Sequence, residues 1–265
     1  MTTVHDCNKY GEELEQRLQL RTSPIALKLL KNENDIPKGA ISPKRDRGYH
    51  IALCQAFSLA RRQKETILMR KEDHWCLHPV IAFGLAELPE SYPEWNLYYP
   101  KSVADLEAAK RLAKESPRLK PGKYIGLVVA PLNNTPFIPD MVIAYCNSGQ
   151  LRMLLSAAKY KKGYQTTVVM EPGGACIQAT IPVLLGGEVN VAVPCAGDRK
   201  TAMAQDDEMV FSFHRNWFGD LMEGLRHADE AGLGYRAVLP NVYPEYPQDD
   251  AGLELRKMLG LEIPD

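Results

Sequence analysis

Apolar runs of strand length alternate with helical patterns along the chain, and this alternation constrains the fold more than any other feature. The strand-like runs are either continuously apolar or alternate with polar residues, and they span residues 25–30, 66–69, 124–130, 139–146, 166–170, 189–193 and 209–213. Helical spacing of apolar residues fills most of the intervals, at 12–20, 50–62, 80–88, 103–113, 150–160 and 216–231. The alternation predicts an α/β or α+β protein with a mixed sheet and helices packed on it.

The composition is that of an ordinary globular protein. The chain has 265 residues and a formal net charge of -1, and 45% of its residues are hydrophobic. This balance gives no electrostatic reason to expect a nucleic acid or an anionic membrane as partner. Neither a secretory signal nor an apolar run long enough to span a membrane is seen, so we predict a cytoplasmic protein.

Six cysteines in a chain expected to occupy a reducing compartment are not predicted to form a disulfide framework. Core packing, metal ligation and reactive thiol chemistry are the roles that remain open. Cys7 lies in a terminal segment that we expect to fray, and Cys146 lies within an apolar strand. Both are therefore predicted to be structural.

The other four cysteines follow a repeated arrangement. Cys54 lies near the start of a predicted helix, and Cys76 follows it by about twenty residues in a loop; Cys176 and Cys195 repeat this arrangement. The repetition suggests one compact domain built from two similar halves, about 1–120 and 121–265, whose half-sites meet. Four thiolates suit an iron–sulfur cluster, with [4Fe–4S] as the natural form, or a tetrahedral zinc ion. No CxxC pair occurs, so scattered buried thiols and a single nucleophilic thiol remain alternatives.

The segment 186–215 is unusually dense in reactive groups. Cys195 follows Pro194 at the end of a predicted strand, and a loop with Asp198 and Arg199 comes next. We predict that Asp198 and Arg199 bind a cofactor or substrate, although a structural ion pair between them is the alternative. Nucleotide-binding motifs of the GxxxxGK[ST] and GxGxxG types are absent, as are the GxSxG and HExxH motifs of hydrolases.

Several of these segments together carry a family resemblance. Cys54 within LCQAFSLARR, Cys76 ahead of an apolar helix ending in FGL, the strand PDMVIAY with NSGQLRMLLSAAKY after it, GGACIQATIPVLLGG and NVAVPCAGDRKTAMAQDDEMVFSFH occur in that order. This order resembles family 169 of the domains of unknown function over about residues 10–230. The resemblance implies a bacterial or archaeal cytoplasmic protein whose four thiols fall in the recognisable segments, and it implies no activity.

Three functional hypotheses follow from the residues. The first is a cytoplasmic iron–sulfur or other metal-binding protein that uses its dispersed cysteines for redox or small-substrate chemistry, with a small molecule or a redox partner protein as its counterpart. The second is a cluster-free protein that binds a small ligand, or an accessory protein, with structural cysteines. The third is a cysteine-dependent enzyme. The sequence is compatible with a homo-oligomer and does not decide the point.

Overall fold

The computed structural model describes residues 2–163, 165–235 and 248–262. The chain divides into a large unit, residues 1–235, and a C-terminal unit, residues 236–265. Within the C-terminal unit the structure describes the helix α11 (Asp250–Met258), which begins where the Asp249 side chain accepts a hydrogen bond from the Gly252 N–H. The candidate site belongs wholly to the large unit.

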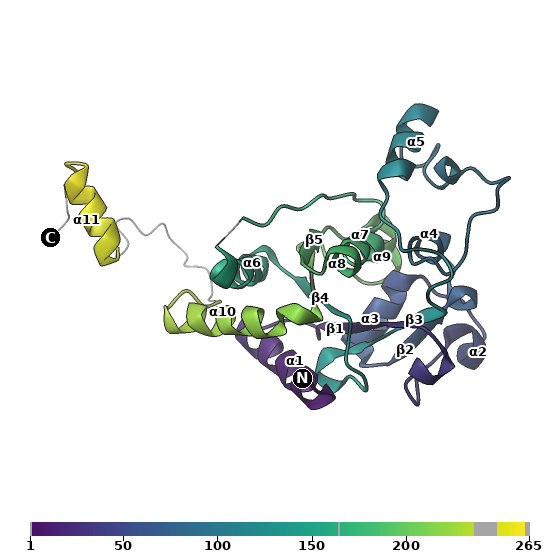
Figure 1. Ribbon diagram of the computed structural model, residues 1–265, viewed down its shortest axis with the longest axis horizontal. Coiled ribbons are helices and arrows are strands. Elements are labelled where there is room, and N and C mark those ends of the chain that lie inside the picture. Colours follow the sequence, from purple (N-terminus) through teal and green to yellow (C-terminus); the bar gives the residue numbers. More distant parts are fainter. Residues whose placement is uncertain (1, 164, 236–247, 263–265) are drawn as a thin grey trace. The chain divides into compact units, whose positions relative to one another are not determined.

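A six-stranded sheet forms the centre of the large unit, and its helices make the fold a mixture of α and β structure (Figure 1). The strands lie in the order β2-β3-β1-β4-β6-β5 and every neighbouring pair is antiparallel. Within the described residues, parallel pairing is found in two isolated bridges, Ile41 with Ile67 of β2 and Ile51 with His74 outside the strands. The predicted class, a mixture of α and β structure, is confirmed. The strands are β1 (Ile25–Leu30), β2 (Ile67–Arg70), β3 (Gly126–Pro131), β4 (Met141–Cys146), β5 (Val189–Ala192) and β6 (Met209–His214).

The strand order is symmetric about the contact between β1 and β4. Strands β1, β2 and β3 lie on one side in the order 2-3-1, and β4, β5 and β6 lie on the other in the matching order 4-6-5. Two similar halves would produce this order, with their boundary between β3 and β4 rather than near residue 120. The division into halves remains a prediction.

Helices cover both faces of the sheet because successive strand residues point to opposite sides. Ala26 and Leu30 of β1 join the core cluster that contains α1 (Val4–Leu18), α6 (Ser148–Lys162) and α10 (Phe218–Glu230). Ile25 and Leu27 join the opposite cluster, with α3 (Leu53–Gln63), α4 (Leu77–Ala82), α7 (Ala175–Gln178) and α8 (Ile181–Gly186). The two faces of the sheet thus carry separate cores.

The other helices of the large unit are α2 (Pro43–Arg47), α5 (Leu106–Glu115) and α9 (Ala196–Thr201), and short 3-10 turns join several elements. Helix α2 lies in a segment rich in proline and glycine, residues 36–49. The helix is short, and Pro43 at the first position favours it because proline already has a helical φ.

The predicted strand over 166–170 is wrong. Its β-branched residues have strand propensity, but no partner strand pairs with it, and the Val169 side chain is 79% exposed. Propensity expresses how well a residue fits a half-buried pleated surface, so it does not make a strand where that surface is missing. This segment instead lines a cavity described below.

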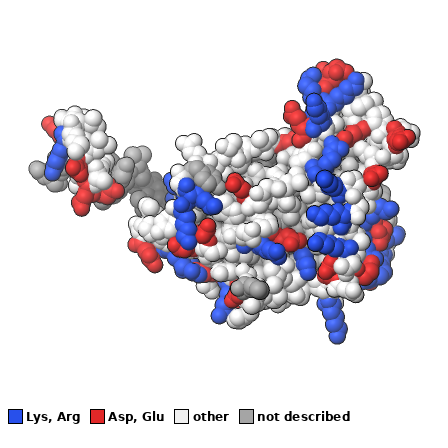
Figure 2. Space-filling model, viewed as in Figure 1, with Lys and Arg blue, Asp and Glu red and all other residues white. Residues whose placement is uncertain are grey.

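The surface of the large unit carries both signs of charge, as Figure 2 shows for one face. Among the helices that the structure describes, none combines the length and the apolar character that crossing a membrane requires.

Helices α6 and α10 lie side by side in Figure 1 and approach closely at Gly224. A Cβ atom at Gly224 would lie 2.5 Å from the Ala157 carbonyl oxygen and 2.7 Å from its Cα. Both atoms belong to backbone, which cannot move aside as a flexible side chain can. Glycine at this position therefore sets the separation of the two helices.

Substitution of Gly224 by alanine is expected to lower the free energy of unfolding by about 1–3 kcal/mol, the usual cost of forcing extra volume into a packed core. Gly219→Ala is the matched control, because nothing lies within 4 Å of a Cβ placed there on the same helix. The control should leave stability unchanged or raise it, since alanine favours helix. Urea unfolding of the three proteins measures the difference, and equal stability of both variants would contradict the packing argument.

Candidate metal centre

Four cysteines lie in the first turns of four different helices. Cys54 is the second residue of α3 and Cys176 the second residue of α7, while Cys76 and Cys195 are the N-caps of α4 and of α9 (Ala196–Thr201). Helix α3 packs against α7 and α9, and α4 packs against α7. The fold therefore brings together chain segments that are far apart in sequence.

The charges of these thiols act on one another. Burial, together with the smaller effects of the charges of Asp198, Cys195 and Cys76, raises the pKa of Cys54 to about 12. Burial also raises the pKa of Cys176 well above its ordinary value, and Cys54, Cys195 and Cys76 add to this effect. Such mutual repulsion requires proximity, so the four thiols lie in one region on one face of the sheet.

Backbone N–H groups lie beside three of the four sulfur atoms. The Asp198 N–H donates to the Cys195 Sγ at 3.5 Å. The backbone N–H groups of Gln55 and His78 lower the pKa values of Cys54 and Cys76, which burial has raised, while the Gln55 N–H donates its hydrogen bond to the Ala52 carbonyl. Free N–H groups in the first turn of a helix stabilise negative charge on a nearby sulfur.

No three His, Cys, Asp or Glu side chains in the described part of the chain are spaced as one bound ion would need. A tetrahedral zinc ion with Zn–S bonds of about 2.3 Å would require sulfur atoms about 3.8 Å apart. A [4Fe–4S] cluster takes one thiolate on each of four irons, so its ligands stand farther apart.

The structure separates Asp198 from Arg199, so the alternative of an ion pair between them is wrong. Asp198 is buried and accepts a hydrogen bond from the Tyr145 hydroxyl at 2.8 Å. Arg199 is exposed and pairs with Asp206. The segment after Cys195 is helix α9 rather than the predicted loop, and consecutive helical residues point in different directions. Only Asp198 faces the thiols, and the binding role of both residues remains a prediction.

A buried network of polar side chains lies beside the thiols and was not predicted from the sequence. The Arg61 guanidinium makes two hydrogen bonds to the Glu208 carboxylate, at 2.8 and 3.1 Å, and lies 3.8 Å above the Tyr145 ring. One signal was present in the sequence, because Cys54 and Arg61 are seven residues apart and share a helix face. The sequence did not indicate that Tyr145 joins the network, since its hydroxyl is one polar group in an otherwise apolar strand.

Several buried polar atoms beside the thiols lack a hydrogen-bond partner within the described ranges. They are the Asp198 Oδ1, both ring nitrogens of His74 and the Nε2 of His78. Burial raises the pKa of Asp198 to about 6 and lowers that of His74 to about 4. Buried polar groups are nearly always paired, so a gathering of orphaned atoms marks a place where a bound group or ordered water belongs.

Cys7 and Cys146 lie in the core on the opposite face of the sheet. Cys146 is structural, as its apolar strand predicted. The frayed terminus predicted for Cys7 is wrong, because a capping box between Thr3 and Asp6 begins α1 three residues earlier and Cys7 is fully buried. Neither thiol adjoins the other four.

Fold and site together define an α/β protein with an antiparallel sheet and a group of four thiols on one face. A model of the family described as "Uncharacterised ArCR" (DUF169) matches residues 13–224. The chain therefore belongs to family 169 of the domains of unknown function, as its motifs indicated.

One curated relative shows similarity along most of the chain. It is the uncharacterized protein MJ0308 of the archaeon Methanocaldococcus jannaschii, which is 25% identical over 227 residues, covering 84% of this chain and 95% of the relative. No solved structure matches the chain.

Removal of the Arg61 guanidinium should be costly, because it leaves the buried Glu208 carboxylate with only the Gln205 N–H at 2.9 Å and the Arg62 guanidinium at 3.9 Å. Arg61→Met is expected to lower the free energy of unfolding by about 3–5 kcal/mol. Arg45→Met breaks an exposed ion pair with Asp46 and should cost less than about 1 kcal/mol. Chemical denaturation compares them, and the double variant Arg61→Met, Glu208→Gln should recover part of the loss. A loss no larger than that of Arg45→Met would show that the network is not a stabilising element.

Proposed function

We propose that this protein binds an iron–sulfur cluster, in the [4Fe–4S] form, through Cys54, Cys76, Cys176 and Cys195. One observation carries the proposal: of six cysteines, the four that begin helices gather on one face of the sheet, and the two without such a position lie in the opposite core. If the cysteines were buried only as small apolar side chains, they would not be expected to divide in this way between the two faces of the sheet.

The electrostatics of the site suit metal-bound thiolates. Without a cation, burial and mutual repulsion keep Cys54 and Cys176 protonated at neutral pH. Iron or zinc supplies positive charge that makes the thiolate the stable form. The Asp198 N–H that donates to Cys195 would then bond to a cluster thiolate, an arrangement that adjusts the potential of a cluster.

The same features weigh against a cysteine-dependent enzyme. A nucleophilic cysteine needs a lowered pKa and a base that accepts its proton. The pKa values of Cys54, Cys76 and Cys176 are all raised, with burial as the first cause. The buried imidazole of His74, with its pKa near 4, holds a proton weakly.

A cluster here would approach the surface on the side of Cys76 and Cys195, which are half-buried, whereas Cys54 and Cys176 are buried. The side chains flanking Cys76 are unusually open, with Trp75 76% and Leu77 62% exposed. We propose that a redox partner protein docks on this edge, or that a small substrate reaches the cluster there. The chemistry also requires the reducing compartment that the sequence predicted, the cytoplasm.

Visible absorption of protein purified without oxygen tests the assignment of ligands. Cys54→Ala and Cys195→Ala should each remove most of the cluster absorption, because each deletes a thiolate. Cys146→Ala is the matched control, since it deletes a thiol buried in the opposite core and should keep the absorption. Circular dichroism of each variant checks that the fold survives.

Equal absorption in all three variants would exclude these ligands. The protein could instead be colourless and contain one zinc ion per chain, with the zinc lost in Cys54→Ala and kept in Cys146→Ala. This result would show a zinc site in place of the cluster. Colourless, folded protein without metal after anaerobic purification would reject both forms of the proposal.

A further inference from the structure

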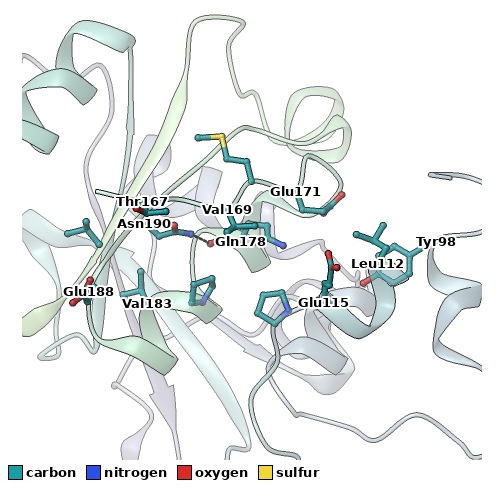
Figure 3. Close-up of a pocket in the computed structure, with 15 residues that line it drawn as sticks. Tyr98, Leu112, Glu115, Thr167, Val169, Glu171, Gln178, Val183, Glu188 and Asn190 are labelled. Carbon is teal, nitrogen blue, oxygen red and sulfur yellow. Dashed lines mark hydrogen bonds between the residues drawn. The ribbon is translucent and has the colours of Figure 1, made fainter. Parts of the chain in front are cut away.

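A cavity of about 490 Å³ lies on the side of α7 away from Cys176. Its walls come from α5, residues 167–171, α7, α8 and β5 (Figure 3). Cys176 and Gln178 are two residues apart on α7, so they point to opposite sides of the helix. Cys176 faces the other thiols and Gln178 lines the cavity. The cavity is thus a separate site from the candidate metal centre.

The lining of the cavity is apolar with negative charge. Leu112, Val183 and other aliphatic side chains provide most of the surface. Three carboxylates also belong to the lining, those of Glu115, Glu171 and Glu188, while no Lys, Arg or His side chain does. Among the described residues none of the three carboxylates forms an ion pair. A positively charged group entering the cavity would therefore meet uncompensated negative charge.

Two residues of the cavity lining are both polar and buried, Gln178 and Asn190. Gln178 is 8% exposed, and no hydrogen bond of its side-chain carboxamide is found within the described ranges. Its backbone carbonyl accepts a bond from the Asn190 Nδ2 at 2.6 Å, which ties α7 to β5. Figure 3 shows the Gln178 carboxamide and the Glu115 side chain directed into the same space. The carboxamide atoms reach the open space of the cavity, so a ligand donor or acceptor can bond to them there.

We propose that this cavity binds a small organic cation, an amine or guanidinium group carried on an apolar body. The Glu115 and Glu171 carboxylates attract the charged group, and the Gln178 carboxamide oxygen accepts one of its N–H bonds. The aliphatic walls cover the apolar body. Small-molecule sites commonly combine apolar walls with a few converging polar groups in this way.

Two probes of nearly equal shape and opposite charge test the proposal: 2-phenylethylammonium and 3-phenylpropionate. Nitrogen-15 NMR of the full chain follows the side-chain amide signal of Gln178, identified as the signal that Gln178→Ala removes. The cation should shift this signal in a saturable way, and the anion should not. Added salt should weaken the binding, because part of the cavity is open to solvent.

Variants assign the binding to named groups. Glu115→Gln should weaken the binding of 2-phenylethylammonium about fivefold, the effect of losing one partly exposed charge partner. Glu107→Gln, on the same helix but outside the cavity, should leave binding unchanged. Absence of binding by the cation, binding of the anion with equal strength, or equal effects of Glu115→Gln and Glu107→Gln would each overturn the proposal. The outcome does not depend on a cluster, because the cavity contains none of the four thiols.

Discussion

The position of four thiols at the starts of four helices, two of them buried and two half-buried, is the constraint on which the rest of the candidate site depends. A buried thiol costs little while it is protonated, but a buried thiolate is expensive without compensating charge. Backbone N–H groups compensate in part at Cys54, Cys76 and Cys195. Full compensation needs a cation, and the buried Asp198 carboxylate beside the thiols increases that need. Without a cation the thiols stay protonated, and under the proposed function a metal group would supply the charge that stabilises their thiolate form.

The sheet explains how these segments meet. Strands β1 and β4 lie at its centre. Helix α3 with Cys54 comes after β1 and α2, and helix α7 with Cys176 comes after β4 and α6, the latter packing on the opposite face. Cys76 and Cys195 come after β2 and β5, which occupy the two edges in matching positions. The repeated spacing of cysteines in the sequence thus corresponds to a repeated position in the sheet. The opposite face has a different role, since α1, α6 and α10 pack there in an apolar core.

Local patterns predicted the elements well where the chain itself determined them. The runs 25–30 and 209–214 form strands β1 and β6, because their hydrophobic pattern matches the pleat and each finds partners. Residues 166–170 fail because strand formation needs a neighbour that local sequence does not reveal. Asn147 caps α6 as its type suggests, since its side chain accepts the Gln150 N–H.

The sequence predicted which cysteines belong to the candidate site, but it did not predict the side chains that surround them. The spacing of Cys54, Cys76, Cys176 and Cys195 suggested convergence. The structure brings their helices to one face of the sheet, and their convergence on one bound group remains a prediction. Arg61 with Glu208 was not predictable, because an ion pair across 147 positions follows from tertiary packing alone. Gln178 was also missed, since nothing in a short apolar helix shows which side faces a cavity.

Native mass spectrometry of the chain purified without oxygen tests the central claim most directly. The account predicts a folded species carrying about four irons and four sulfides per chain, the content of one [4Fe–4S] cluster. A folded species with the mass of the bare polypeptide would contradict the account, and the gathered thiols would then need an explanation other than metal binding.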